Sequence, residues 1–203
     1  LRLRWPPMPA MALASRLSLR GLEDVLRGAP RHLARRGIEL VHLGGAQRPS
    51  ERTERGAGLP PLVLDGQQLE LLSVNLGDKE LTEADYQLTD SHLTLHPTHD
   101  SFTLDTSVRI HPETNTALEG LYKSGGMFCT QCEAEGFRKI TYYLDRPDVM
   151  SRFTTTVIAE QHSYPVLLSN GNPIASGPGE DGRHWATWED PFKKPAYLFA
   201  LVA

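Results

Sequence analysis

The chain has 203 residues, of which 39% are hydrophobic and 23% charged, and its formal net charge at pH 7 is −4. This composition is typical of a soluble globular protein with one ordinary domain, with or without an appendage. No window approaches the roughly 18 consecutive apolar residues that a transmembrane helix needs, so we expect no membrane partner. Two cysteines are too few for a disulfide framework, which favours a reducing, cytoplasmic location.

The charge is divided unevenly along the chain. Residues 1–55 contain eleven Arg, no Lys and five acidic residues, a local charge of +6. Residues 56–203 contain ten basic and twenty acidic residues, a local charge of −10. The chain therefore consists of two parts of different composition, which we call the N-terminal segment (1–55) and the body (56–203).

The N-terminal segment is rich in Arg, Ala, Leu and Gly. Four apolar residues between positions 19 and 26 have helical spacing, and Pro30 would interrupt a helix there. No part of the segment shows the alternation typical of a β-strand. We therefore expect one or two short helices or disorder before the body begins.

Three interpretations of the N-terminal segment compete. Targeting peptides are rich in Arg but avoid acidic residues, and Glu23, Asp24 and Glu39 count against that class. An arm that binds nucleic acid would have Lys or aromatic residues among the Arg, and Trp5 is the one aromatic residue here. The third interpretation is translation of GC-rich DNA in a different reading frame from the body, which fits the use of Arg without Lys.

The body has the pattern of an antiparallel β protein. Runs of alternating apolar and polar residues follow one another, with turn signals every 8–12 residues. In "SFTLDTSVRIHP", Phe102 and Leu104 share one face and are followed by Val108 and Ile110. Similar stretches occupy 60–81, 86–97, 153–160, 164–173, 183–191 and 196–203. The pattern predicts an antiparallel sandwich or another sheet-rich domain.

Two features of the last stretches concern turns and chain length. Ser169 to Pro173, "SNGNP", has the composition of a hairpin turn rather than of a nucleophile-bearing loop. The final apolar run ends at Ala203 in the middle of an expected strand. We therefore expect the natural chain to continue beyond this residue.

Cys129 and Cys132 have the Cys-x-x-Cys spacing of a metal or redox site. A structural zinc site needs four ligands, and the sequence has no second cysteine pair. The surrounding strands do not offer the helix start that a thioredoxin-like redox pair requires. We therefore interpret the two cysteines as partly buried thiols without a metal.

Three histidines, His92, His96 and His99, could gather a metal on a helix, but their segment has the pattern of a strand that ends at Pro97. Alternation places His92 and His96 on one face and leaves His99 beyond the turn. The chain also lacks H-E-x-x-H, G-x-S-x-G and a glycine-rich phosphate loop. We therefore expect no metal site and no catalytic residue in this chain.

Gln131 and Glu133 are two residues apart, so in an extended segment their side chains would point to the same side. An amide oxygen beside a carboxylate is suited to holding an ammonium group, because the carboxylate supplies charge and both groups accept hydrogen bonds. From spacing alone, a solvated polar strand face is the better explanation of the pair. The residues by themselves leave both explanations open.

The stretch "NTALEGLYKSGGMFCTQCEAEGFRKITYYLDRPDV" resembles the N-terminal domain of the aminopeptidase N family of zinc metallopeptidases (gluzincins), and in particular its bacterial alanyl aminopeptidase branch. The shared pattern is T-Q-x-E, an Arg five residues after the Glu, and D-x-P. Its residues here are Thr130, Gln131, Glu133, Arg138, Asp145 and Pro147. The resemblance covers about residues 56–203, and the N-terminal segment does not share it.

The resemblance implies a saddle-like β domain that packs against a separate, thermolysin-like catalytic domain. It also implies removal of one N-terminal residue from peptide substrates by water that a zinc ion activates. In the family the zinc ligands and the general base lie beyond the part that this chain resembles. We therefore expect that the chain is a fragment, binds no zinc and is inactive alone.

The resemblance assigns substrate-binding roles to Gln131 and Glu133. Glu133 would pair with the free α-ammonium of the peptide, and Gln131 would border that amine and the first side-chain pocket. Arg138 and Asp145 would orient the loop. The alternative function is a non-catalytic module that binds peptide amines. Nucleic acid is not an expected partner, because the body is acidic.

Overall fold

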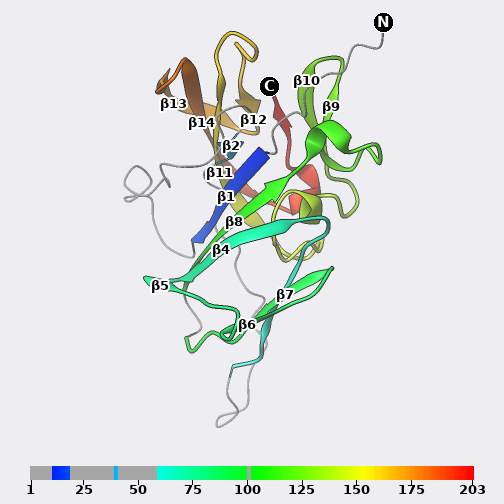
Figure 1. Cartoon of the computed structure of the whole chain (residues 1–203), viewed down its shortest axis with the longest axis vertical. Helices are drawn as coiled ribbons and strands as arrows, with labels where there is room; N and C mark the ends of the chain where they lie inside the picture. The colour runs from blue at the N-terminus through cyan, green and yellow to red at the C-terminus, as the bar shows by residue number, and fades with distance from the viewer. Residues whose placement is uncertain (1–10, 19–38, 41–58, 100–101) are drawn as a thin grey trace, which may run out of the picture.

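The computed structural model describes residues 11–18, 39–40, 59–99 and 102–203 (Figure 1). Within these residues the chain is mainly β-strand, and every strand pairing is antiparallel. The helical elements in the same residues are three single 3-10 turns, η1 (Pro112–Thr114), η2 (Phe137–Lys139) and η3 (Ala196–Leu198). The expected mainly β, antiparallel fold is confirmed.

Two sheets form the middle and lower parts of Figure 1. The first has the strand order β1-β8-β4-β5, with β1 (Met11–Ser18), β8 (Thr103–Ile110), β4 (Glu70–Leu76) and β5 (Lys79–Glu80). The second has the order β3-β7-β6, with β3 (Leu62–Asp65), β7 (His92–Leu95) and β6 (Tyr86–Leu88). Each contains one pair of consecutive strands joined by a short turn, β4-β5 and β6-β7, and the other neighbours are separated in the chain.

Two further sheets contain most of the C-terminal half. One has the order β13-β14-β11-β2, with β13 (Asn172–Pro178), β14 (Arg183–Lys194), β11 (Ser151–Glu160) and β2 (Glu39–Leu40). The other has the order β12-β15-β10-β9, with β12 (Leu168–Ser169), β15 (Leu201–Val202), β10 (Met127–Gln131) and β9 (Gly120–Ser124). We call the latter the β10 sheet, because β10 leads into the candidate site.

The alternation predicted for residues 101–112 is confirmed in β8. Partly exposed and buried residues alternate without interruption along this strand. Leu104, Val108 and Ile110 are buried in the core, while Arg109 forms an ion pair with Glu70 of the neighbouring strand. A strand with one face on the core and one toward water requires this period of two.

The expectation that the N-terminal segment contains no strand is wrong for its two described pieces. β1 pairs with β8 along its whole length, from Met11 opposite Ile110 to Ser18 opposite Thr103. The short strand β2 pairs with β11. The sequence of β1, "MALASRLS", does place large apolar residues two or four positions apart, so the alternation was present but short. The helical spacing predicted between 19 and 26 lies outside the described residues.

The turn at residues 169–173 does not form the hairpin that its composition predicts. β12 and β13, which flank it, belong to different sheets. Asn170 explains the difference, because its side chain accepts a hydrogen bond from Ala200 N–H at 2.6 Å and donates one to Leu198 C=O at 3.0 Å. The turn is thereby tied to the chain before β15 and passes from one sheet to the next.

The core contains a cluster of aromatic rings around Phe137 of η2. The ring centroid of Phe137 lies 4.9 Å from that of Tyr143, 5.9 Å from Phe153 and 5.1 Å from Phe199, all in edge-to-face geometry. Such pairs add about 0.5–1.5 kcal/mol each to the free energy of burial. Phe137 has no exposed surface. The residues just before it are therefore attached to the most tightly packed part of the domain.

Replacing Phe137 with Ala should lower the free energy of unfolding by about 3–5 kcal/mol, because it removes a ring with close neighbours and leaves a cavity. The matched control is Phe192→Ala, since that ring is 75% exposed and its loss should change stability by less than about 0.5 kcal/mol. Urea unfolding followed by tryptophan fluorescence measures both. Equal midpoints for the two variants would show that the cluster is not central to stability.

Candidate functional site

The candidate site begins where β10 ends. β10 stops at Gln131, and residues 132–136 form a tight turn before η2; we call this turn the 132–136 loop. Gly136 N–H donates a hydrogen bond to Cys132 C=O at 2.9 Å, which closes the loop. A Cβ atom at Gly136 would lie only 2.5 Å from the Gln131 carbonyl oxygen, so a larger residue does not fit.

Gln131 and Glu133 are both exposed, but they are not part of one extended segment. The prediction placed their side chains on one side because it assumed that the strand continued through Glu133. In the structure Glu133 lies in the loop, and the peptide bond that follows it, to Ala134, is cis. Gln131 Nε2 donates to Glu133 C=O at 3.4 Å, so a hydrogen bond from side chain to backbone joins the two residues instead.

The two carboxylates of the loop have different surroundings. Glu135 Oε2 lies 3.3 Å from Arg138 Nη1 and forms an ion pair with it. No Lys, Arg or His of the described part of the chain forms an ion pair with Glu133. Glu133 is therefore a solvent-exposed carboxylate that no cation among the described residues pairs with, whereas Glu135, two residues away, pairs with Arg138.

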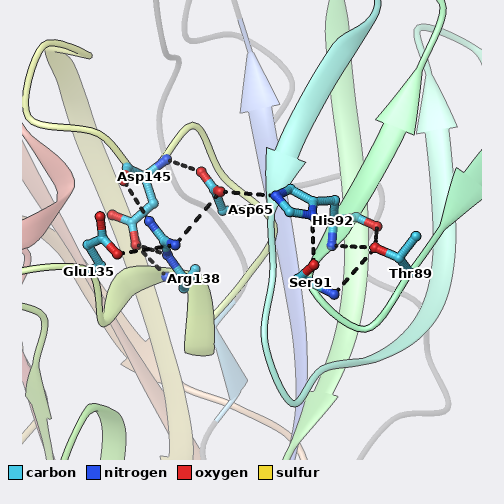
Figure 2. A network of polar contacts seen from close by, with 7 residues as sticks. All are labelled: Asp65, Thr89, Ser91, His92, Glu135, Arg138 and Asp145. Atoms are coloured by element: carbon cyan, nitrogen blue, oxygen red, sulfur yellow. Dashed lines mark hydrogen bonds and ion pairs between the residues drawn. The ribbon is translucent and has the colours of Figure 1, made fainter.

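Arg138 and Asp145 form the centre of the polar network shown in Figure 2. Asp145 Oδ2 accepts hydrogen bonds from the backbone N–H and from Nε of Arg138, each at 3.1 Å, and Arg138 Nη2 donates to the Asp145 C=O at 3.0 Å. Asp145 is only 3% exposed. Burial raises the pKa of this carboxyl, and the bonds from Arg138 act in the opposite direction. These contacts fix the segment after the loop and leave both side chains facing the protein.

The network extends to Asp65, the last residue of β3. Its Oδ2 accepts a hydrogen bond from Asp145 N–H at 3.2 Å, and its Oδ1 lies 3.8 Å from Arg138 Nη1 and 3.7 Å from His92 Nε2. The pattern of the sequence indicated no role for Asp65. Its contacts join residues far apart in the chain, so no local spacing could have identified them.

The two cysteines lie in different surroundings, and no disulfide joins them. Cys132 is buried, and its burial raises the pKa of its thiol to about 12. Cys129 is partly exposed on β10 opposite Tyr122 of β9, and its contact with the hydroxyl raises the pKa of Tyr122. The interpretation of both residues as partly buried thiols agrees with these positions.

The residues described here do not fit a zinc site. Within residues 59–99 and 102–203, no three His, Cys, Asp or Glu side chains approach closely enough to share a metal ion. His92 belongs to β7 and contacts Asp65, while His96 and His99 follow the strand and are exposed. We therefore assign no chemical step to a metal held by these residues.

The C-terminal strand β15 lies directly beside β10, as Figure 1 also shows. Phe128 and Ala203 exchange two backbone hydrogen bonds at 2.8 and 2.9 Å. Thr130 Oγ1 accepts a bond from Leu201 N–H at 2.9 Å. Residues 201–203 thus run beside the strand that ends at Gln131.

Comparison with known proteins identifies the class to which this fold and loop belong. Residues 58–198 match the Peptidase M1 N-terminal domain family. The chain therefore belongs to this family.

None of the helices in the described residues has the length and apolar character needed to span a bilayer.

Among individual proteins, the chain is 54% identical over 154 residues to aminopeptidase N of Escherichia coli, which covers 76% of this chain and 18% of that protein. It is 54% identical over 143 residues to aminopeptidase N of Caulobacter vibrioides, covering 70% and 16%. The chain thus spans less than a fifth of the length of these relatives.

Solved structures show the same relationship. Aminopeptidase A of Legionella pneumophila, in complex with aspartic acid, has a TM-score of 0.68 at 42% identity over 70% of this chain and 17% of that one. An M1 zinc metallopeptidase of Deinococcus radiodurans, bound to a Tyr-Ser-Ala substrate, has a TM-score of 0.59 at 17% identity over 72% and 35%. The second likeness concerns the fold alone.

Native-state alkylation should distinguish the two cysteines. At pH 8 a thiol with a pKa of about 12 is ionised in about one molecule in ten thousand, and Cys132 is also buried. We therefore expect iodoacetamide to label Cys129 first, with Cys132 labelled only after denaturation, as measured by mass spectrometry of peptides. In Cys129→Ser the fast label should disappear; equal labelling of both native cysteines would contradict the geometry.

Proposed function

We propose that this chain supplies the part of an M1 aminopeptidase active site that recognises the free α-amino group of a peptide. Gln131 and Glu133 are the residues that would contact the substrate. The observation that carries the proposal is the exposed Glu133 carboxylate, which no cation of the described residues neutralises, beside the amide of Gln131. The family membership and the relatives named aminopeptidase N support the substrate class.

The charge arrangement favours an ammonium group over an uncharged end of a peptide. A carboxylate and an ammonium attract each other, and the attraction grows when the surroundings exclude water. A blocked or internal amine would leave the Glu133 carboxylate unpaired in a site that the substrate covers. An unpaired buried carboxylate costs far more free energy than a weakened hydrogen bond. This difference would restrict the enzyme to peptides with free N-termini.

The rest of the active site would come from a catalytic domain that binds zinc and supplies the general base. In the M1 zinc metallopeptidase of Deinococcus, a peptide substrate is bound to a protein about three times as long as the matched part, which is 35% of that chain. A domain that follows residue 203 would begin beside β10, because β15 pairs with that strand. The proposed role of this chain is therefore recognition, and that of the catalytic domain is chemistry.

A second candidate function is a non-catalytic module that captures peptide amines by itself. It is favoured by the exposure of Gln131 and Glu133 in the chain as it stands. The same exposure weakens it, since an ion pair between solvated groups is worth at most about 1 kcal/mol. Binding of alaninamide but not N-acetylalaninamide by the free chain, abolished by Glu133→Gln, would support this function.

The role of Glu133 can be tested in a chimera. Residues 59–203 would replace the matching part of Escherichia coli aminopeptidase N, which the 54% identity makes feasible. In the chimera, Glu133→Gln should lower kcat/KM for alanine p-nitroanilide by about a hundredfold, because a charge pair with the substrate is lost. Gln131→Ala should mainly raise KM.

Asp148→Asn is the matched control in this chimera, since it removes a carboxylate charge outside the candidate site. Its carboxylate pairs with Arg146 on the surface, so kcat/KM should change by less than about threefold. Equal losses for Glu133→Gln and Asp148→Asn would rule out a specific role of Glu133, and no loss for either would remove the proposed function.

The free 203-residue chain should neither hydrolyse alanine p-nitroanilide nor contain stoichiometric zinc, because the described residues do not form a metal site. Absorbance of released p-nitroaniline and elemental analysis of the purified chain measure these two properties. Stoichiometric zinc that is lost in Cys132→Ser would overturn the interpretation of the cysteines as simple thiols.

A further inference from the structure

Asp65 joins β3 to the segment that follows the 132–136 loop through its backbone. Asp65 N–H donates to Tyr143 C=O at 2.8 Å, and Tyr143 N–H donates to Asp65 C=O at 3.0 Å. Two residues after Asp65, Gln67 N–H donates to Arg138 C=O at 2.9 Å. The backbone thus holds Asp65 against residues 138–145, although it lies in a different sheet from β10.

The Asp65 side chain uses this position to contact three groups. Its Oδ2 accepts the Asp145 N–H, and its Oδ1 faces Arg138 Nη1 and His92 Nε2 from opposite sides (Figure 2). The side chain of Asp65 is 22% exposed and that of Arg138 is 15% exposed, so water screens their attraction only in part.

Arg138 divides its nitrogen atoms between two tasks. Nε and Nη2 face Asp145, one through its carboxylate and one through its carbonyl oxygen. Nη1 faces Asp65 at 3.8 Å and Glu135 of the loop at 3.3 Å. A planar guanidinium can serve both sides at once, which a lysine ammonium could not do with the same geometry.

We propose that Asp65 is a positioning residue for the 132–136 loop, which it orients through Arg138. By holding Nη1 between β3 and the loop, Asp65 lets Arg138 engage Glu135, and this pairing leaves Glu133 as the carboxylate free for an amine. The importance of a free Glu133 rests on the proposed function. The positioning itself does not, because it concerns the unliganded chain.

Two further contacts make the position of Asp65 well defined. His92, on its far side, has its Nδ1 2.7 Å from Ser91 Oγ, so the imidazole has a partner at each nitrogen. Gly66 lies so close to Tyr142 that an added Cβ would come within 2.2 Å of the ring. Asp65 therefore acts from a rigid strand end, as a positioning group must.

Hydrogen exchange of single amides in the intact chain tests this role without a ligand. The Gly136 amide reports opening of the loop, because it bonds to Cys132 C=O. The Gln161 amide, bonded to Gly182 C=O at 3.0 Å beside the paired ends of β11 and β14, reports opening in another sheet. In Asp65→Asn, which keeps the shape but loses the charge, Gly136 should exchange about tenfold faster and Gln161 should be unchanged.

Asp148→Asn is the matched control, since its carboxylate pairs with Arg146 on the surface and lies outside the network; it should change neither amide. Unchanged exchange at Gly136 in Asp65→Asn overturns the proposal, and so does equal acceleration of both amides, which would indicate a global effect. If Asp65→Asn does not fold, Asp65→Ser decides, because its hydroxyl can still accept a hydrogen bond but carries no charge for Arg138 Nη1. Faster exchange confined to Gly136 then supports the proposal, and unchanged exchange overturns it.

Because no substrate is present in this measurement, its failure is separate from a failure of amine recognition. Unchanged Gly136 exchange with a hundredfold loss for Glu133→Gln in the chimera would remove Asp65 and keep the proposed function. The reverse result would keep the positioning and remove the role of Glu133.

Discussion

The contact between Arg138 and the buried carboxylate of Asp145 is the interaction on which the candidate site depends. It closes the segment from η2 to residue 145 through three hydrogen bonds, one of them from the backbone. A buried carboxylate without such partners would be costly, so the segment has little freedom to adopt another arrangement. Phe137, adjacent to Arg138, fixes the same segment in the aromatic cluster. The polar network and the core thus both hold the segment that follows the 132–136 loop.

This attachment explains how a loop with exposed side chains can have a defined shape. The 132–136 loop is fixed at one end by β10, which β9 and β15 flank, and at the other by η2. Gly136 permits the close approach of the two ends. The loop therefore presents Gln131 and Glu133 to solvent from a rigid support, which is what their proposed role in amine recognition requires.

Much of the body could be predicted from local pattern. The alternation in β8 and the runs corresponding to β3, β7, β11 and β14 led to the correct fold class, because a half-buried strand imposes a period of two on its sequence. β1 was missed because only Met11, Leu13 and Leu17 carry its alternation, and the Ala and Ser residues among them weaken the contrast between the two faces. The turn at Asn170 was recognised as a turn, but its connection between two sheets depends on contacts with residues near 200.

The sequence by itself determined the mainly β fold through alternation in the strands, and its T-Q-x-E pattern and flanks singled out Gln131 and Glu133 as candidate substrate-binding residues. Only the tertiary structure decided which carboxylate of the loop Arg138 pairs with, which is Glu135 and not Glu133. It also brought Asp65 and His92 to the same network from other strands. Contacts between distant segments arise from the packing of sheets, and no local spacing encodes them.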